Sequence, residues 1–179
     1  MHSKKYAIFP LLLLIPFFLF AQQDKMNVSG NQALPDVEIR NLDGVAFNTH
    51  NISNNGAPVI ICFWATYCKP CIKELSIISD LYDDWRQETG VKIVAISIDD
   101  SKTIANVLPF VNGKGWEYEF YTDVNGDFKR AMNVNVIPHT FILNSKSEIV
   151  WQHLSFAEGD ELKYIEIVRI LLKDKMNPK

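Results

Sequence analysis

The chain has 179 residues, of which 47% are hydrophobic and 22% charged, with a net charge of −3. These values suit one globular domain with a sizeable core. The acidic balance disfavours nucleic acid and anionic membrane surfaces as partners. Three cysteines are too few for a disulfide framework. A single close pair in an exported domain therefore indicates a redox-active disulfide rather than a structural one.

The first 21 residues differ from the rest of the chain. Lys4 and Lys5 make a positive start, residues 7–20 are almost wholly apolar, and a polar stretch follows Ala21. This layout predicts a secretory signal peptide over residues 1–21, cleaved near Ala21, and so a periplasmic or otherwise exported protein. A retained membrane anchor is the less favoured alternative, because the apolar run is short for a membrane span and carries two prolines. We therefore expect no stable membrane anchor after cleavage. Removing two lysines and no acid leaves 16 basic against 21 acidic residues.

The remaining chain is predicted to be a linker at 22–33, which is polar and small, followed by one domain at 34–175. In chain order we first expect a hairpin of strands at 37–39 and 45–49, a strand at 59–65, a helix at 69–88 and a strand at 91–98. A helix at 101–111 follows, which is expected to end or kink at Pro109. The chain then continues with a strand at 116–121, a short helix at 127–132, a hairpin of strands at 140–143 and 148–153, and a closing helix at 158–172. This order predicts a mixed α/β sheet flanked by helices.

Residues 59–71 combine an apolar strand, a short turn and the start of a helix, with Cys68 and Cys71 at the junction. The free N–H groups and dipole of a helix N-terminus stabilise a thiolate, here that of Cys68. Cys-x-x-Cys within an alternating strand–helix pattern is typical of a thioredoxin-like redox motif. Helical spacing turns Cys71 inward and leaves Cys68 free to face solvent. Cys68 is therefore the predicted nucleophile, and Cys71 the resolving thiol.

One combination of residues resembles the active site of the thioredoxin superfamily: Trp64, Ala65, Cys68, Pro70 and Cys71. The element order over 58–172 is similar to the thioredoxin fold, and the N-terminal hairpin and the helix–strand insertion at 101–121 are what the TlpA/ResA-like branch adds. The resemblance implies an exported disulfide reductase, and many members of that branch act in cytochrome c maturation. It also implies a disulfide-containing exported protein as acceptor and a membrane thiol protein as electron donor, with no cofactor.

Three residues are expected to tune the cysteine pair. Pro70, at an early helical position, stiffens the turn, and the resemblance associates the Lys69–Pro70 dipeptide with redox poise, Pro being typical of reducing members. The positive charge of Lys69 favours a neighbouring thiolate or is simply solvated. Glu74 lies beside Cys71 at i, i+3, where partial burial would raise its pKa and fit it to shuttle a proton. The resemblance supports this role, since ResA-like proteins carry a Glu at that spacing; an ordinary surface carboxylate is the alternative.

Four residues are expected to bind the substrate around the pair. Pro138 matches the family's cis-proline, whose loop pairs with a substrate strand, and Ile137 would then border the substrate groove. A trans proline at a strand start is the alternative. Trp64 and Tyr67 flank Cys68 and are expected to form an apolar rim for partner recognition, although Trp64 could serve core packing only.

Two other functions use the same residues. A copper or zinc chaperone would employ Cys68, Cys71 and His139, but His139 is expected to alternate away from the site and no second cysteine pair closes a structural zinc site. We therefore expect no metal. A peroxiredoxin would need a threonine three residues before its reactive cysteine, whereas Thr66 precedes Cys68 by two. Cys62 stands where thioredoxin itself carries a buried acid, and is expected to be a buried small hydrophobe.

Overall fold

The computed structural model describes residues 32–176, so the predicted signal peptide and residues 22–31 of the predicted linker lie outside the described residues. No helix within 32–176 combines the length and apolar character needed to cross a membrane. The strands are β1 (Gln32–Ala33), β2 (Glu38–Asn41), β3 (Ala46–Asn48), β4 (Val59–Trp64), β5 (Lys92–Ser97), β6 (Glu119–Thr122), β7 (His139–Leu143) and β8 (Glu148–Leu154). The α-helices are α1 (Lys69–Thr89), α2 (Val107–Lys114), α3 (Asp127–Ala131) and α4 (Asp160–Met176), with 3-10 turns η1 (Thr49–Asn51) and η2 (Ile104–Asn106).

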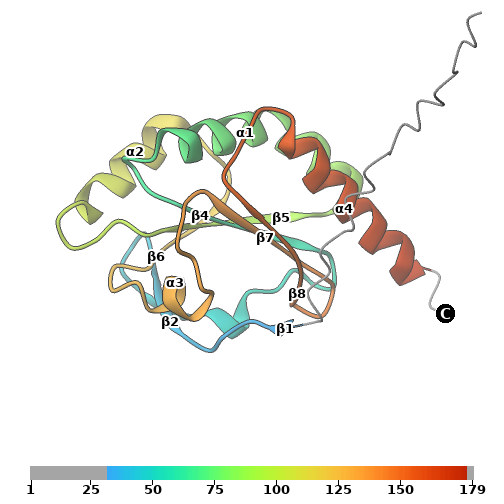
Figure 1. The fold of residues 1–179 in the computed structure, drawn as a ribbon, viewed down its shortest axis with the longest axis horizontal. Helices are drawn as coiled ribbons and strands as arrows, with labels where there is room; N and C mark the ends of the chain where they lie inside the picture. Colours follow the sequence, from blue (N-terminus) through green and yellow to red (C-terminus); the bar gives the residue numbers. More distant parts are fainter. Residues whose placement is uncertain (1–31, 177–179) are drawn as a thin grey trace, which may run out of the picture.

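All the described strands join one mixed sheet in the order β1-β8-β7-β4-β5-β6-β2-β3. β4 is parallel to β5 and antiparallel to β7, and β5 is parallel to β6. Helices α1, α2 and α4 cover one face of the sheet, whereas α3 lies against the other (Figure 1). This is the mixed α/β architecture with a thioredoxin-like order of elements that the sequence predicts.

β4 is the central strand because every one of its residues is apolar and can be buried on either face. Alternate side chains point to opposite faces of a strand. Ile60, Cys62 and Trp64 accordingly pack with α1, α2 and α4, while Val59, Ile61 and Phe63 join the second core around α3. The apolar residues at helical spacing along α1 are likewise buried: Cys71, Leu75, Ile78, Tyr82 and Trp85.

The structure corrects the expected start of the domain. Gln32 and Ala33, assigned to the linker from their composition, form β1 and pair antiparallel with Glu148 and Ile149 of β8. The expected hairpin is present, with β2 antiparallel to β3, and it is attached to the sheet through β6. A two-residue strand carries too few residues for an alternating pattern, so its pairing could not be seen in the sequence.

The predicted helix at 101–111 is also wrong in its bounds. Asp100 accepts the backbone N–H groups of Lys102 and Thr103 and so holds a turn, and α2 begins only at Val107. Pro109 is the third residue of α2, where a backbone N–H has no intrahelical acceptor to lose. It therefore neither ends nor kinks the helix, which stops at Gly115 in the left-handed conformation.

Candidate active site

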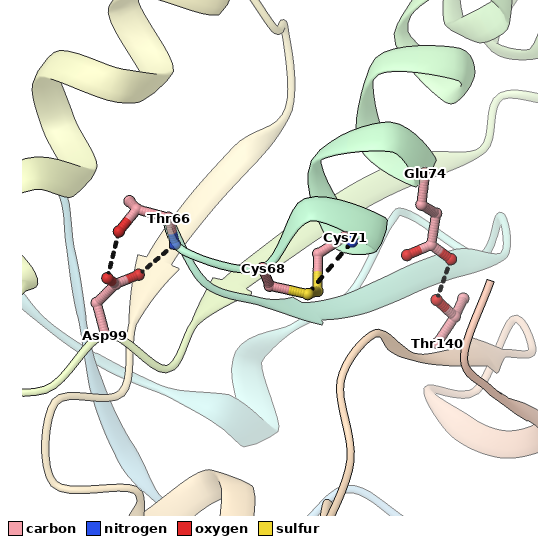
Figure 2. The surroundings of a disulfide bond; sticks show 6 residues. All are labelled: Thr66, Cys68, Cys71, Glu74, Asp99 and Thr140. Atoms are coloured by element: carbon pink, nitrogen blue, oxygen red, sulfur yellow. Dashed lines mark hydrogen bonds between the residues drawn. A yellow bond between two sulfur atoms is a disulfide. The ribbon is translucent and has the colours of Figure 1, made fainter.

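The two cysteines are disulfide-bonded at the N-terminal end of α1, immediately after the loop that leaves β4 (Figure 2). Their Cα atoms lie 5.3 Å apart. Cys68 is the N-cap of α1, and its Sγ accepts a hydrogen bond from the Cys71 backbone N–H at 3.3 Å. Cys68 was expected to face solvent, yet only 8% of it is exposed, whereas Cys71 is completely buried. The order of exposure is as predicted, but Cys68 is less exposed than expected.

A buried aspartate fixes the loop that carries Cys68. The Thr66 backbone N–H donates to Asp99 Oδ2 at 2.9 Å, and the Thr66 hydroxyl donates to Oδ1 at 2.6 Å (Figure 2). The Ser97 hydroxyl also donates to Oδ2, at 2.8 Å. Asp99 is therefore an anchor between the end of β5 and the cysteine loop, a role that the sequence does not predict. Because the Thr66 hydroxyl is held by Asp99, it is not directed at the sulfur as a peroxidase site would require.

Glu74 is buried completely rather than partly. The Thr140 hydroxyl from β7 and the Tyr164 hydroxyl from α4 both donate to its Oε1, each at 2.8 Å. The other oxygen, Oε2, is buried without a partner and points to the side on which the disulfide lies (Figure 2). Burial raises the pKa of Glu74 to about 7, and Asp160 adds to the rise, although the two hydroxyl donors oppose it. The predicted direction of the pKa shift is confirmed.

The two residues that hold Glu74 were not singled out by the sequence as site residues. Thr140 was assigned only to a strand, and Tyr164 only to the closing helix. Each donates a hydrogen bond to Glu74 from an element that is distant in the sequence. In the sequence itself, the one sign of this role is a polar hydroxyl at a position expected to face inward. A buried hydroxyl requires a partner, and that requirement could have directed attention to both residues.

The loop before β7 carries the predicted cis bond, between Ile137 and Pro138. Pro138 is buried, and its carbonyl accepts the Ser155 backbone N–H at 2.8 Å. Ile137 is half-buried and packs against the core cluster that includes both cysteines. Because Phe63 lies opposite His139 in the β4–β7 pair, the loop after β4 and the loop before β7 share one edge of the sheet.

The residues predicted to flank the pair divide into two groups. Tyr67 is 63% exposed, and Lys69 and Pro70 are exposed at the start of α1. Trp64 is completely buried, within contact range of Phe110, Trp116 and Phe120, so it belongs to the core and not to an apolar rim. Trp64 is the last residue of β4 and its side chain packs against α2, whereas Tyr67 lies in the loop that follows and is exposed.

The residues of the metal-binding alternative are not brought together. His139 is buried, stacks on Phe141 with ring centroids 4.2 Å apart, and lies 3.0 Å from Gln152 Oε1 through Nε2. Across residues 32–176 no cluster of three or more His, Cys, Asp or Glu side chains is arranged to hold a metal ion. Cys62 is a free, fully buried thiol, as expected, and burial raises its pKa.

Comparisons with known proteins agree with this site. The family described as AhpC/TSA matches residues 30–152. The thiol-disulfide oxidoreductase ResA of Bacillus anthracis is 28% identical over 144 residues, covering 80% of this chain and 79% of that protein, and ResA of Oceanobacillus iheyensis is 29% identical over 146 residues, covering 78% and 74%. Among solved structures, an uncharacterized thioredoxin-like protein from Porphyromonas gingivalis is 46% identical with a TM-score of 0.72, covering 81% of this chain and 95% of that one. StoA from Bacillus subtilis is 24% identical with a TM-score of 0.59, covering 75% and 98%, and shows the fold alone.

Proposed function

This chain belongs to the AhpC/TSA family and is a thiol–disulfide oxidoreductase, and from that premise we propose that it reduces disulfides of exported proteins. One observation carries the proposal: a Cys68–Cys71 disulfide at a helix N-terminus, with the second cysteine buried near a carboxyl whose pKa is about 7. At a pH near 7 both protonation states of this carboxyl are populated, so it can either hold a proton or accept one during the exchange.

In the proposed reaction the reduced protein supplies two electrons to its substrate. The Cys68 thiolate, favoured by the free N–H groups at the start of α1, attacks one sulfur of the substrate disulfide. A Cys68–substrate disulfide forms, and the other substrate sulfur leaves as a thiolate. Cys71 then attacks Cys68 Sγ, so that the substrate leaves with both sulfurs reduced and the Cys68–Cys71 disulfide is restored.

Glu74 is the proposed acceptor of the Cys71 proton in the second step. A thiol must lose its proton to attack, and Cys71 has no exposure to water through which to lose it. The unpartnered Oε2 of Glu74 lies on the disulfide side, while Oε1 is occupied by two hydroxyl donors (Figure 2). Those donors hold the carboxyl in one orientation and leave one oxygen available for proton transfer.

The substrate is proposed to meet the exposed surface around Cys68. Tyr67, Lys69 and Pro70 are exposed beside it, and the loop of Ile137 and Pro138 borders the same edge of the sheet. An exported location, a membrane thiol protein as electron donor and a place in cytochrome c maturation complete the proposal. They rest on the leader-like N-terminal sequence and on the similarity to ResA.

Equilibration of the Cys68–Cys71 couple against defined thiol buffers tests the direction. A reductase is expected near the potential of thioredoxin, roughly −270 mV, and a value near that of a strong oxidant, roughly −120 mV, would reverse the direction. Cys68→Ser should abolish exchange with any disulfide. Cys71→Ser should instead accumulate the mixed disulfide, and Glu74→Gln should slow release of the substrate by roughly 10²-fold. Equal behaviour of the two serine variants would contradict the assigned roles.

A further inference from the structure

A hollow of about 480 Å³ lies beside the cis-proline loop, on the face of the sheet that α3 covers. Its walls are formed by Asn133, Asn135, Val136, His139, Gln152, His153 and Leu154. A smaller hollow of about 170 Å³ shares Asn133 and Gln152 with the first and extends to Gln32 in β1. Together the two follow β8 from its pairing with β1 to the loop that precedes β7.

Beyond Ile149, the outer edge of β8 along this hollow is unpaired among the residues that the structure describes. β1 pairs with only Glu148 and Ile149, and among residues 32–176 no strand pairs with the outer side of the rest of β8. The Ser155 N–H bonds to the Pro138 carbonyl, and alternate residues of an antiparallel strand direct their backbone groups to the same side. The backbone N–H and C=O groups of Gln152 and Leu154 therefore point away from β7. An added strand could pair with them.

His139 is one of the residues that line the hollow. Only 3% of the residue is exposed, and its Nδ1 is buried without a hydrogen-bond partner. Because Nε2 bonds to the amide oxygen of Gln152, Nε2 carries the ring hydrogen and Nδ1 is an acceptor. Burial lowers the pKa of His139, which keeps the ring neutral. The His139 ring therefore adds no charge to the wall of the hollow.

Resting on the proposed function, we propose that the hollow and the edge of β8 bind an uncharged, extended segment of the substrate protein next to its disulfide. The residues named in its walls carry amide, imidazole and apolar side chains and no acid, lysine or arginine. A peptide segment would pair with the β8 edge and place an apolar side chain on Val136 and Leu154, which are 54% and 57% exposed. The same segment continues past the cis-proline loop to Cys68.

Two probes with the same leaving group test this site in the full-length Cys71→Ser protein. One is a short uncharged peptide with threonine and leucine around a central cysteine, and the other is N-acetylcysteine amide, both activated as mixed disulfides with thionitrobenzoate. The Cys68 thiolate attacks the cysteine sulfur of the probe, the new disulfide forms, and thionitrobenzoate leaves with the electron pair of the broken bond. Its absorbance gives both rate constants.

Leu154→Glu and Val136→Glu are each expected to lower the ratio of the peptide rate to the small-probe rate at least tenfold. Val45→Glu, which changes an exposed apolar residue in the hairpin at the other edge of the sheet, should leave that ratio unchanged. An unchanged ratio in both hollow variants would overturn the proposal. If neither probe reacts with Cys68, the proposed function fails, and this inference fails with it.

Amide hydrogen exchange gives a second readout on the trapped complex. The N–H groups of Gln152 and Leu154 are expected to exchange rapidly in the free protein and to become protected when the peptide is linked to Cys68. Protection already present in the free protein would mean that the chain itself covers this edge, which would overturn the assignment to substrate.

Discussion

The two faces of β4 differ in chemistry although they belong to the same six residues. On the face covered by α1, α2 and α4, Cys62 lies near Cys71, Glu74, Thr140 and Tyr164, so buried polar groups are brought together there. On the opposite face, Phe63 packs between Phe128 and Phe141 within a cluster of apolar side chains.

This difference indicates that one face supports reactivity and the other supports rigidity. A buried carboxylate is unfavourable by desolvation, whereas close-packed aromatic rings are favourable by burial. The stability given by the apolar face can offset the unfavourable burial of Glu74. Substitutions on the two faces should therefore change different properties.

The largest effect on stability is expected from Phe63→Ala on the apolar face. Removal of this fully buried ring should lower the free energy of unfolding by about 3–5 kcal/mol, because a cavity remains between Phe128 and Phe141. Urea unfolding measures the loss, and the milder Phe63→Leu provides a folded comparison. The difference in stability between pH 5 and pH 8 should stay as in the unchanged protein. A loss below 1 kcal/mol would contradict the structural role of this face.

Glu74→Gln should stabilise the protein at high pH. The pKa of Glu74 rises from 4.5 to about 7 on folding, so between these values the folded state binds more protons than the unfolded state. The free energy of unfolding consequently falls as pH rises through this window, by about 3 kcal/mol in total. Gln cannot ionise, so the variant should lack this fall and gain most of that amount above pH 7.

Urea unfolding of both proteins between pH 4.5 and 8.5 measures the effect of Glu74. Glu166→Gln, an exposed change on α4, is the matched control and should alter stability by less than about 0.5 kcal/mol at every pH. Parallel curves for the unchanged protein and Glu74→Gln would show that the carboxyl keeps its ordinary pKa in the fold.

Thr66→Val tests the anchor that orients the cysteine loop. Valine keeps the shape of threonine but leaves Asp99 Oδ1 without its hydroxyl donor, which should cost about 2 kcal/mol of stability. Thr103→Val removes a longer hydrogen bond, 3.3 Å, from a surface turn and should change stability by less than about 0.5 kcal/mol. Similar losses in the two variants would contradict a special role for the Asp99 anchor.

Local patterns predicted much of this fold and part of the site. The apolar run of β4, the helical stripe of α1 and the helix-start position of Cys68 each depend on residues close in the sequence. The position of Glu74 beside Cys71 on the same helix predicted partial burial, whereas its complete burial depends on Thr140 and Tyr164 from other elements.

Features that depend on distant elements were predicted poorly. The two-residue β1 is defined by its pairing with β8, and Trp64 is buried because α2 and β6 place aromatic rings against it. Asp99 meets Thr66 only when β4 and β5 pair. None of these partners leaves a periodic signal in the sequence, because the contacts are set by tertiary packing.

The smallest expected effect separates a positioning role of Tyr164 from simple packing. Tyr164→Phe removes a hydroxyl that favours the charged form of Glu74, so the pKa of Glu74 should rise further above its ordinary value. The free energy of unfolding should then continue to fall over about one further pH unit. By about pH 9 this adds about 1.4 kcal/mol to the loss seen in the unchanged protein. Tyr82→Phe, which removes a hydroxyl that contacts the Ile93 backbone and not Glu74, should leave the pH dependence unchanged. A uniform loss at all pH values in Tyr164→Phe would mean that the ring only packs, and that Thr140 alone controls the ionisation of Glu74.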